Sequence, residues 1–345
     1  MNKLLFLFLV PFALYSQEPS EEVPHEHKSP QEIQKELDEA EAQYKDALEM
    51  FNPWYSGPLL TGSSSMMPPG SANIQPYIFV TDNYARFDEN HHSHSIPDLL
   101  QVNPQFLIQA GVTNWMDAVL GLQTLTSWQS HQNSGGFGDM SLTIGFPLLR
   151  QTPYLPGIKI TFAETFPTGK YDHLSSTKLG TDSTGGGVYQ TAFGLAISKV
   201  VFWSFKHPMN LRATLNYAIS TTAHVKGFNA YGGGFGTDAK VRPGNAFRAN
   251  IGIEYSFTQR WVFANDFVYS YNCHTTFSGN PGTTSTGAAA GLGGQSNYLF
   301  SWAPAIEYNP TPNLGFVAGV WVSLYGRNAL NFISGIASVT YTFQF

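Results

Sequence analysis

The sequence predicts an all-β fold, a twelve-stranded antiparallel transmembrane β-barrel of the bacterial outer membrane with a short N-terminal periplasmic helix. Three observations carry this prediction. Only 12% of the 345 residues are charged, while 14% are aromatic and 33 are glycine. Polar and apolar residues alternate over stretches of about 9–11 residues, the length of a tilted strand that crosses a membrane. The chain also begins with an export signal, so its strands can reach an outer membrane.

The first 16 residues are typical of a secretory signal peptide. Lys3 precedes an apolar run from Leu4 to Leu14, and the small Ser16 comes before the polar Gln17. This run is shorter than the roughly 20 residues that a membrane-spanning helix needs. We therefore expect residues 1–16 to be cleaved and the mature chain to be located in the cell outer membrane.

Residues 17–53 predict an acidic periplasmic helical segment. The helix starts at Ser29-Pro30-Gln31-Glu32, where Ser and Glu have the spacing of a capping box. An apolar residue then recurs every three or four positions, at Ile33, Leu37, Ala40, Tyr44, Ala47 and Phe51. This stripe either packs against the rest of the chain or forms a short oligomeric seam. Residues 54–70, rich in Pro, Gly and Ser, predict a linker.

Residues 71–345 predict the barrel itself. The alternation is clear from Phe247 to Phe257, where every second residue is apolar. The connections between strands are alternately short and long, and the long ones are rich in Gly, Ser and His, as mobile outer loops are. An even strand count returns both ends to the periplasm. The twelve expected strands are 72–82, 101–112, 116–128, 138–149, 157–166, 189–199, 210–221, 246–257, 260–271, 297–308, 314–325 and 334–345.

The last strand carries the most specific pattern. From Ala337 to Phe345 aromatic or apolar residues alternate with Ser, Thr and Gln, and the chain ends in Phe. This resembles the C-terminal signature that the outer-membrane barrel assembly machinery reads. The resemblance implies that Tyr341, Phe343 and Phe345 form the assembly signal.

Two motifs resemble those of a known family. Gly136-Phe137-Gly138-Asp139-Met140-Ser141-Leu142 and, further on, Phe166-Pro167-Thr168-Gly169-Lys170-Tyr171 have the form G-x-G-D-x-x-L … P-T-G-x-Y. This pattern is similar to that of the outer-membrane β-barrel family labelled "MetA-pathway of phenol degradation", which includes transporters. Trp54 to Leu60 and Asn73 to Tyr77 resemble a subgroup of such barrels. The resemblance implies a barrel channel.

Charged side chains on the strands have inward parity, because an Arg or Lys facing lipid at mid-membrane costs about 2–4 kcal/mol. We therefore expect them to line the pore. They either form a charged constriction that selects solutes or a structural network of ion pairs. Glu164 has outward parity, and we expect a β-bulge to turn it inward. The predicted pore-lining residues are Asp139, Lys159, Arg212, Arg248, Glu254, Asp266 and Glu307.

Composition and motifs bear on other classes of protein. A net charge of −6 disfavours nucleic acid as a partner, and a single cysteine, Cys273, disfavours a disulfide framework or a structural zinc cluster. His91, His92 and His94 could bind a metal, but a polar outer loop is the simpler interpretation, so no metal or cofactor is expected. Ser and His occur together at Ser93-His94 and Ser130-His131, without the motif of a barrel phospholipase.

We therefore expect a non-enzymatic outer-membrane channel for passive passage of small polar, amphipathic or aromatic molecules. Its expected partners are outer-membrane lipid, the barrel assembly machinery and a small-molecule solute. Two alternatives remain, an outer-membrane lipid hydrolase of the twelve-stranded type and a surface-exposed adhesin or structural barrel. The sequence does not identify the solute.

Overall fold

The computed structural model describes residues 29–50, 52–204 and 207–345. The chain divides into two compact units, residues 1–45 and 46–345. The predicted signal peptide, residues 1–16, lies outside the described residues. In the part that the structure describes, no helix is both long enough and apolar enough to cross a membrane.

Helix α1 (Pro30–Met50) begins where the sequence predicts. The Ser29 amide donates to the Glu32 carboxylate (2.8 Å), and the Glu32 amide donates to the Ser29 hydroxyl (3.3 Å). This reciprocal pair satisfies amide groups that the first helical turn leaves without backbone partners. On the surface of the helix, Ile33, Leu37 and Tyr44 are exposed.

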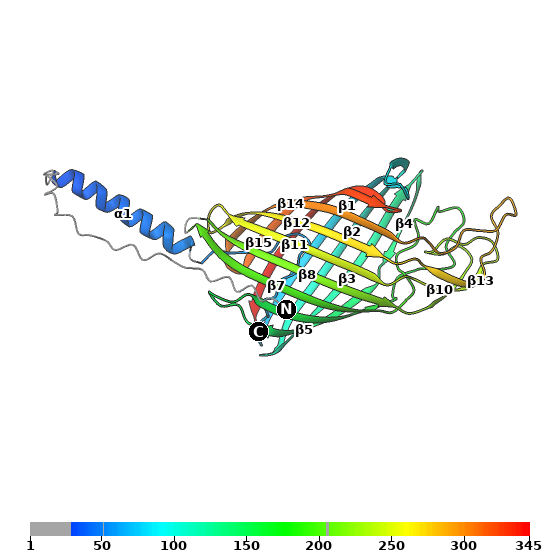
Figure 1. The fold of residues 1–345 in the computed structure, drawn as a ribbon, viewed down its shortest axis with the longest axis horizontal. Coiled ribbons are helices and arrows are strands. Elements are labelled where there is room, and N and C mark those ends of the chain that lie inside the picture. The colour runs from blue at the N-terminus through cyan, green and yellow to red at the C-terminus, as the bar shows by residue number, and fades with distance from the viewer. Residues whose placement is uncertain (1–28, 51, 205–206) are drawn as a thin grey trace, which may run out of the picture. The chain divides into compact units, whose positions relative to one another are not determined.

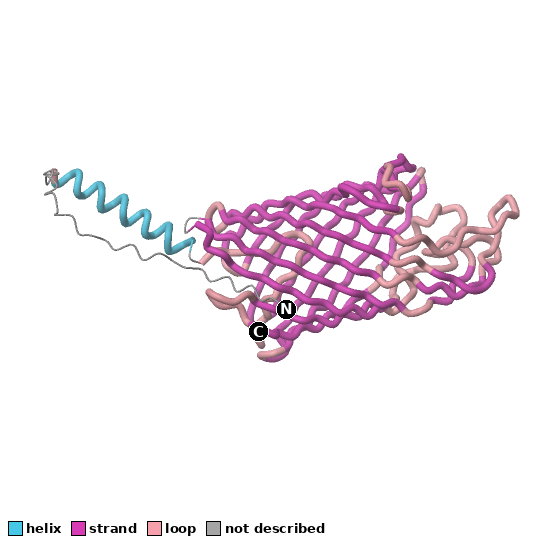
Figure 2. The backbone as a smooth tube through the Cα atoms, viewed as in Figure 1, coloured by secondary structure: helices cyan, strands magenta, loops and turns pink. Residues whose placement is uncertain are grey.

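The larger unit contains a closed antiparallel barrel of twelve strand positions (Figures 1 and 2). The sheet runs in the order β2-β1-β16-β15-β14-β12-β11-β8-β7-β6-β5-β3-β4, and the pairing of β2 with β3 closes it. Figure 1 shows short turns and the C-terminus at one end of the barrel and the long loops at the other. The barrel strands are β1 (Ser71–Phe87), β2 (Ser93–Thr113), β3 (Met116–Gln129), β4 (Gln132–Phe137), β5 (Met140–Leu149), β6 (Gly157–Phe166), β7 (Gln190–Ser204), β8 (His207–Ser220), β11 (Ala246–Ser256), β12 (Trp261–Asn272), β14 (Asn297–Thr311), β15 (Leu314–Arg327) and β16 (Leu330–Gln344).

All twelve predicted strands are present, and two predicted outer loops are wrong. Residues 83–100 were expected to be a loop, but β1 extends to Phe87 and β2 begins at Ser93, so only residues 88–92 join them. Residues 129–137 were expected to be an outer loop, but 132–137 form β4, which continues the line of β5 along β3. The turn consists of Ser130 and His131, with φ of 45° and 67°. Two successive positive φ values are typical of the two-residue turn of a β-hairpin. Such turns usually contain Asn-Gly or another Gly pair, which this one lacks, so the sequence did not indicate a hairpin here.

Two of the long loops also contain strands that the sequence did not predict. β9 (Ala223–Lys226), β10 (Asp238–Arg242) and β13 (Thr276–Asn280) form a separate three-stranded sheet in the order β13-β10-β9. Val225 and Val241 are fully buried in its apolar cluster, together with Val188, Ala223 and Ala239. Short β-branched segments inside Gly-rich loops therefore pair because together they bury an apolar face.

The barrel wall has its apolar side outward. On β8, Leu211, Leu215 and Ile219 are exposed, whereas Arg212 and Thr214 are buried. A water-soluble sheet shows the opposite arrangement, because it buries its apolar face. The exposed apolar band suits hydrocarbon, and the inner face carries the polar groups that form the candidate site.

Candidate functional site: the lumen of the barrel

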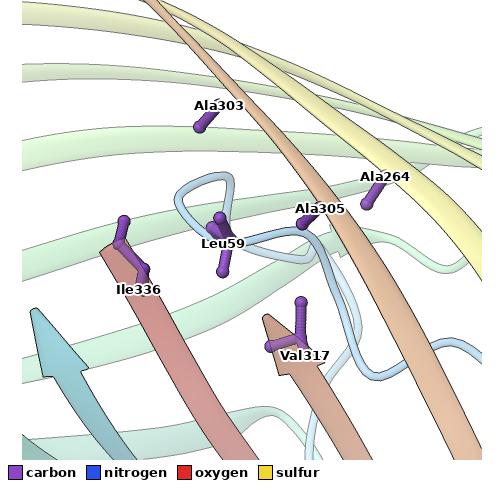
Figure 3. Close-up of a cluster of buried hydrophobic side chains, with 6 residues drawn as sticks. All are labelled: Leu59, Ala264, Ala303, Ala305, Val317 and Ile336. Atoms are coloured by element: carbon purple, nitrogen blue, oxygen red, sulfur yellow. The ribbon is translucent and has the colours of Figure 1, made fainter. Parts of the chain in front are cut away.

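A stretch of irregular chain, residues 53–69, lies inside the barrel; we call it the lumen segment. Its Leu59 is 4% exposed and packs in an apolar hollow on the inner wall (Figure 3). Three of the five residues around Leu59 are alanines, and their short side chains leave the space that Leu59 occupies. The hollow is formed by Ala264, Ala303, Ala305, Val317 and Ile336.

Two wall carboxylates hold the backbone of the lumen segment. Asp266 on β12 accepts the amides of Leu60 and Thr61, each at 3.0 Å, and the Thr61 hydroxyl at 2.5 Å. Glu307 on β14 accepts the amide of Ser56 at 3.0 Å. Both carboxylates are fully buried. An irregular segment needs such acceptors, since a buried amide without a partner costs about 1–3 kcal/mol.

The lumen segment also contacts the other side of the wall. The Ser64 amide donates to the Ser198 hydroxyl on β7 at 2.9 Å. The Lys159 ammonium on β6 donates to the Ser65 carbonyl at 3.1 Å. The segment is therefore fixed to strands on both sides of the ring and narrows the lumen between them. Its composition alone had indicated a linker, and nothing in the sequence announced these contacts.

The inner wall carries two buried ion pairs. Arg212 forms a two-pronged pair with Glu254, at 2.5 Å from Nε and 3.0 Å from Nη2, and Asn210 donates to the same carboxylate at 2.7 Å. Lys159 Nζ lies 3.5 Å from Asp117 Oδ2. Sequence reasoning omitted Asp117, although its inward parity on the strand 116–128 could have revealed it. Each pair neutralises charges that would be costly to bury singly.

A cavity of about 1070 Å³ remains beside the lumen segment. Of the predicted pore-lining residues, Lys159, Arg212 and Arg248 border it. Glu254, Asp266 and Glu307 are fully covered by their partners. Most of the predicted site residues therefore lie on the same inner wall, but they fall into two groups. Lys159, Arg212 and Arg248 border the cavity, whereas Glu254, Asp266 and Glu307 do not contact it.

Asp139 lies away from this group, between β4 and β5 at the end with the long loops. Its carboxylate accepts the amides of Gly169 (2.9 Å) and Gly186 (2.7 Å). Thr168 donates to the Gly138 carbonyl at 2.8 Å and accepts the Met140 amide at 3.0 Å. The two motifs identified in the sequence therefore contact each other, and they hold the break between β4 and β5.

The expected bulge at Glu164 is wrong. The pairing of β6 with both neighbours runs without interruption from Lys159 to Thr165, so Glu164 keeps its outward parity. Its carboxylate accepts the Thr191 hydroxyl at 2.7 Å. The residue lies two positions from the end of β6, and near the membrane surface an outward charge costs little.

Two of the predicted assembly residues, Tyr341 and Phe343, lie on β16, which pairs with β1, and Phe345 directly follows this strand. Phe343 is in register with Ala72, and Tyr341 is in register with Ile74. The Phe345 amide donates to the Gly70 carbonyl at 2.8 Å, and its ring is 79% exposed. An exposed terminal ring is available to a protein that binds the end of this strand.

The histidines and serines considered for other functions are dispersed. His94 Nε2 lies 2.9 Å from Asp88 Oδ2, while His91 Nδ1 lies 3.0 Å from the Gly326 carbonyl. Hydrogen bonds that the His94 ring and the amides of His92 and Asn90 donate to the Asp88 carboxylate hold the pKa of Asp88 below its usual value. Within residues 29–50, 52–204 and 207–345, no three metal-binding side chains converge, and no hydroxyl is hydrogen-bonded to a histidine ring except that of Tyr298.

The closed barrel, its apolar outer face and its polar lumen define a transmembrane β-barrel of the outer-membrane type. A solved outer membrane channel from Pseudomonas putida F1 has the same fold, with a TM-score of 0.64 and 12% identity over 83% of this chain and 100% of that chain. At this identity the likeness shows the fold alone.

Two other solved structures are more distant. The translocator domain of the autotransporter NalP from Neisseria meningitidis has a TM-score of 0.42 and 10% identity, over 90% of this chain and 98% of that one. The Pseudomonas putida toluene transporter TodX has a TM-score of 0.36 and 12% identity, over 83% and 96%.

The chain belongs to the family described as "Putative MetA-pathway of phenol degradation", which matches residues 80–309. The resemblance noted in the two motifs is therefore confirmed. No match is found among curated proteins.

Proposed function

We propose that the protein is an outer-membrane channel through which small polar, amphipathic or aromatic molecules pass down their gradient. One observation carries this proposal: the closed barrel encloses a cavity of about 1070 Å³ that is lined by side chains able to contact a solute. That volume suits a small molecule.

The lumen segment adds to the proposal. It is held by hydrogen bonds to Asp266 and Glu307 rather than by a continuous strand, so it can be displaced without opening the barrel. In the proposed channel, this segment sets the width of the path, and residues 1–16 serve as the signal peptide that brings the chain to the outer membrane.

Electrical recording and solute uptake test the proposal together. Purified mature protein in planar bilayers is expected to give discrete conductance steps, and proteoliposomes are expected to swell in small neutral solutes. Swelling that requires no energy source supports passive passage. Protein that is folded by its electrophoretic mobility but silent in both assays, with and without the lumen segment, would refute the channel.

A further inference from the structure

Four polar side chains on the inner wall share one register row. Thr161, Asn216, Arg248 and Ser270 lie on β6, β8, β11 and β12, and Gly194 occupies the same row on β7. Among the residues that the structure describes, none of these four side chains has a hydrogen-bond or ion-pair partner. Three of them, Thr161, Asn216 and Arg248, line the cavity.

Arg248 differs in this respect from the other cations of the inner wall. Arg212 is paired with Glu254, and Lys159 is paired with Asp117. Arg248 therefore presents a guanidinium to the cavity without a counter-charge. A guanidinium that is exposed to the cavity and unpaired can form charge-assisted hydrogen bonds with an anionic ligand.

The side-chain amides of β2 and β3 that line the cavity already donate to protein groups. On β2 and β3, Asn103 donates to Gln123 (3.3 Å) and Gln109 donates to Asp117 (2.6 Å). Asn216 has no such partner in the described part of the chain, so its amide is available to a solute. The polar groups that are free to bind a ligand are thus concentrated on the β6–β11 side.

Gly194 brings the free groups together. A Cβ atom at this position would lie 2.5 Å from Asn216 Oδ1 and would also collide with Thr161 Oγ1. The absence of a side chain at Gly194 therefore leaves room for the side chains of Thr161 and Asn216 to approach each other next to Arg248. Neighbouring strands are about 4.8 Å apart, so a small anionic group can contact Arg248 and Asn216 at once.

The opposite wall, on β2 and β3, carries three apolar side chains among its amide side chains. In the ring of twelve strand positions β2 lies six places from β11 in either direction. Leu107 on β2, with Val119 and Leu125 on β3, lines the cavity on that side. A solute that places a charge at Arg248 can therefore place an apolar body against these side chains.

We propose that Arg248, with Asn216 and Thr161, forms a binding subsite for the carboxylate of a small amphipathic acid inside the lumen. Two N–H groups of the guanidinium match the two carboxylate oxygens, and the amide and hydroxyl donate to the remaining lone pairs. A phosphate dianion fits less well because a second negative charge would lack a counter-ion. The role of this subsite in uptake rests on the proposed channel function, although binding itself does not.

Calorimetric titration of the full mature protein in detergent tests the subsite directly. Benzoate is expected to bind, benzamide and phenyl phosphate to bind at least about tenfold more weakly, and R248Q to lose benzoate binding by a similar factor. R248K should keep part of the affinity. R242Q, which removes an exposed arginine from β10, is the matched control and should bind as the wild type does. Equal binding of benzoate to R248Q and wild type would overturn the proposal.

Swelling assays separate the failure of the subsite from that of the channel. In proteoliposomes, wild-type protein is expected to admit benzoate faster than benzamide, and R248Q is expected to remove that difference while keeping benzamide entry. Equal entry of both solutes into wild-type vesicles would refute the subsite and leave the channel intact. Entry of neither solute, with benzoate still bound in solution, would refute the channel and retain the subsite. The mobility of each variant before and after heating verifies its folding.

Discussion

At the scale of single residues, the inner wall contains polar groups of two kinds. Glu254, Asp266 and Glu307 are fully buried and bonded, either to Arg212 or to the backbone of the lumen segment. Arg248 reaches the cavity without a partner in the described chain. Groups of the first kind stabilise the arrangement of the lumen, while the second kind is available for a solute.

The Arg212–Glu254 pair gives the first prediction. E254Q removes the charge that compensates a buried guanidinium, so it is expected to destabilise the barrel by about 3–5 kcal/mol. Urea unfolding in lipid vesicles measures this change. Glu89 in an outer loop is exposed, so E89Q is the matched control and should unfold like the wild type. The double variant R212Q/E254Q should recover part of the loss, and unaltered unfolding of E254Q would contradict a stabilising pair.

A loop carboxylate gives a prediction about pH. Burial alone would raise the pKa of Asp182, but hydrogen bonds from Lys170 (2.7 Å) and from the Ser175 amide (3.1 Å) outweigh burial and hold that pKa below its usual value. The ionised form therefore stabilises the loop above the ordinary pKa of about 3.9, and the benefit is lost as the pH falls through the lower, folded-state pKa.

Proteolysis of this loop measures the effect. Cleavage by pepsin, which is active in acid, should increase in the wild type as the pH falls below about 4. D182N lacks the titrating group and should be cleaved at a rate that changes less with pH. A wild type and a D182N variant with the same pH dependence would contradict the assignment to Asp182.

At the scale of elements, the lumen segment shows how an irregular chain is held inside a barrel. Apart from a single bridge between Pro69 and Gly111 of β2, it pairs with no strand, and wall side chains contact it at successive points. Leu59 provides its apolar anchor. Removing this anchor should loosen the segment while the closed ring of strands persists, because the ring's own backbone hydrogen bonds are unaffected.

L59A is the variant for this prediction. A large-to-small change at a buried site costs about 2–5 kcal/mol. In L59A this loss should weaken the binding of the lumen segment to the barrel wall. Single-channel conductance is expected to rise and to fluctuate more than in the wild type. S63A, on the same segment but outside the apolar hollow, is the control and should conduct normally. A conductance unchanged in L59A would show that the segment does not set the width of the path.

At the scale of the whole molecule, the exposed apolar wall and the closed ring require a membrane environment. Deleting Phe345 removes the exposed ring at the end of β16 and the amide that bonds to Gly70. We expect less protein in the outer membrane and slower appearance of the heat-modifiable, protease-resistant form. Deletion of the first residue after the signal peptide, Gln17, is the control for truncation. Normal yield without Phe345 would contradict its role in assembly.

The strands and their facing were predictable from the sequence because both depend on local alternation. The predicted strand 157–166 coincides with β6, and the inward parity assigned to Arg212 and Glu254 agrees with their burial. The paired motifs were also visible, although their contact through Thr168 and Asp139 was not. Side-chain parity repeats every two residues and needs no knowledge of distant partners.

The tertiary structure alone decided what lies inside the barrel. The lumen segment shows no periodic pattern in the sequence. Its amides donate individually to Asp266 and Glu307, which lie more than 200 positions away in the chain, so local sequence could not reveal these contacts. The same holds for Arg212 and Arg248, which have equivalent patterns in the sequence. Arg212 forms an ion pair with Glu254, whereas Arg248 forms no hydrogen bond or ion pair with any of the described side chains. Alternation fixes which face a residue takes, but the partner of a side chain depends on the register of the neighbouring strand. Glu254 lies on β11 two positions from Gly252, which is in register with Arg212 on β8.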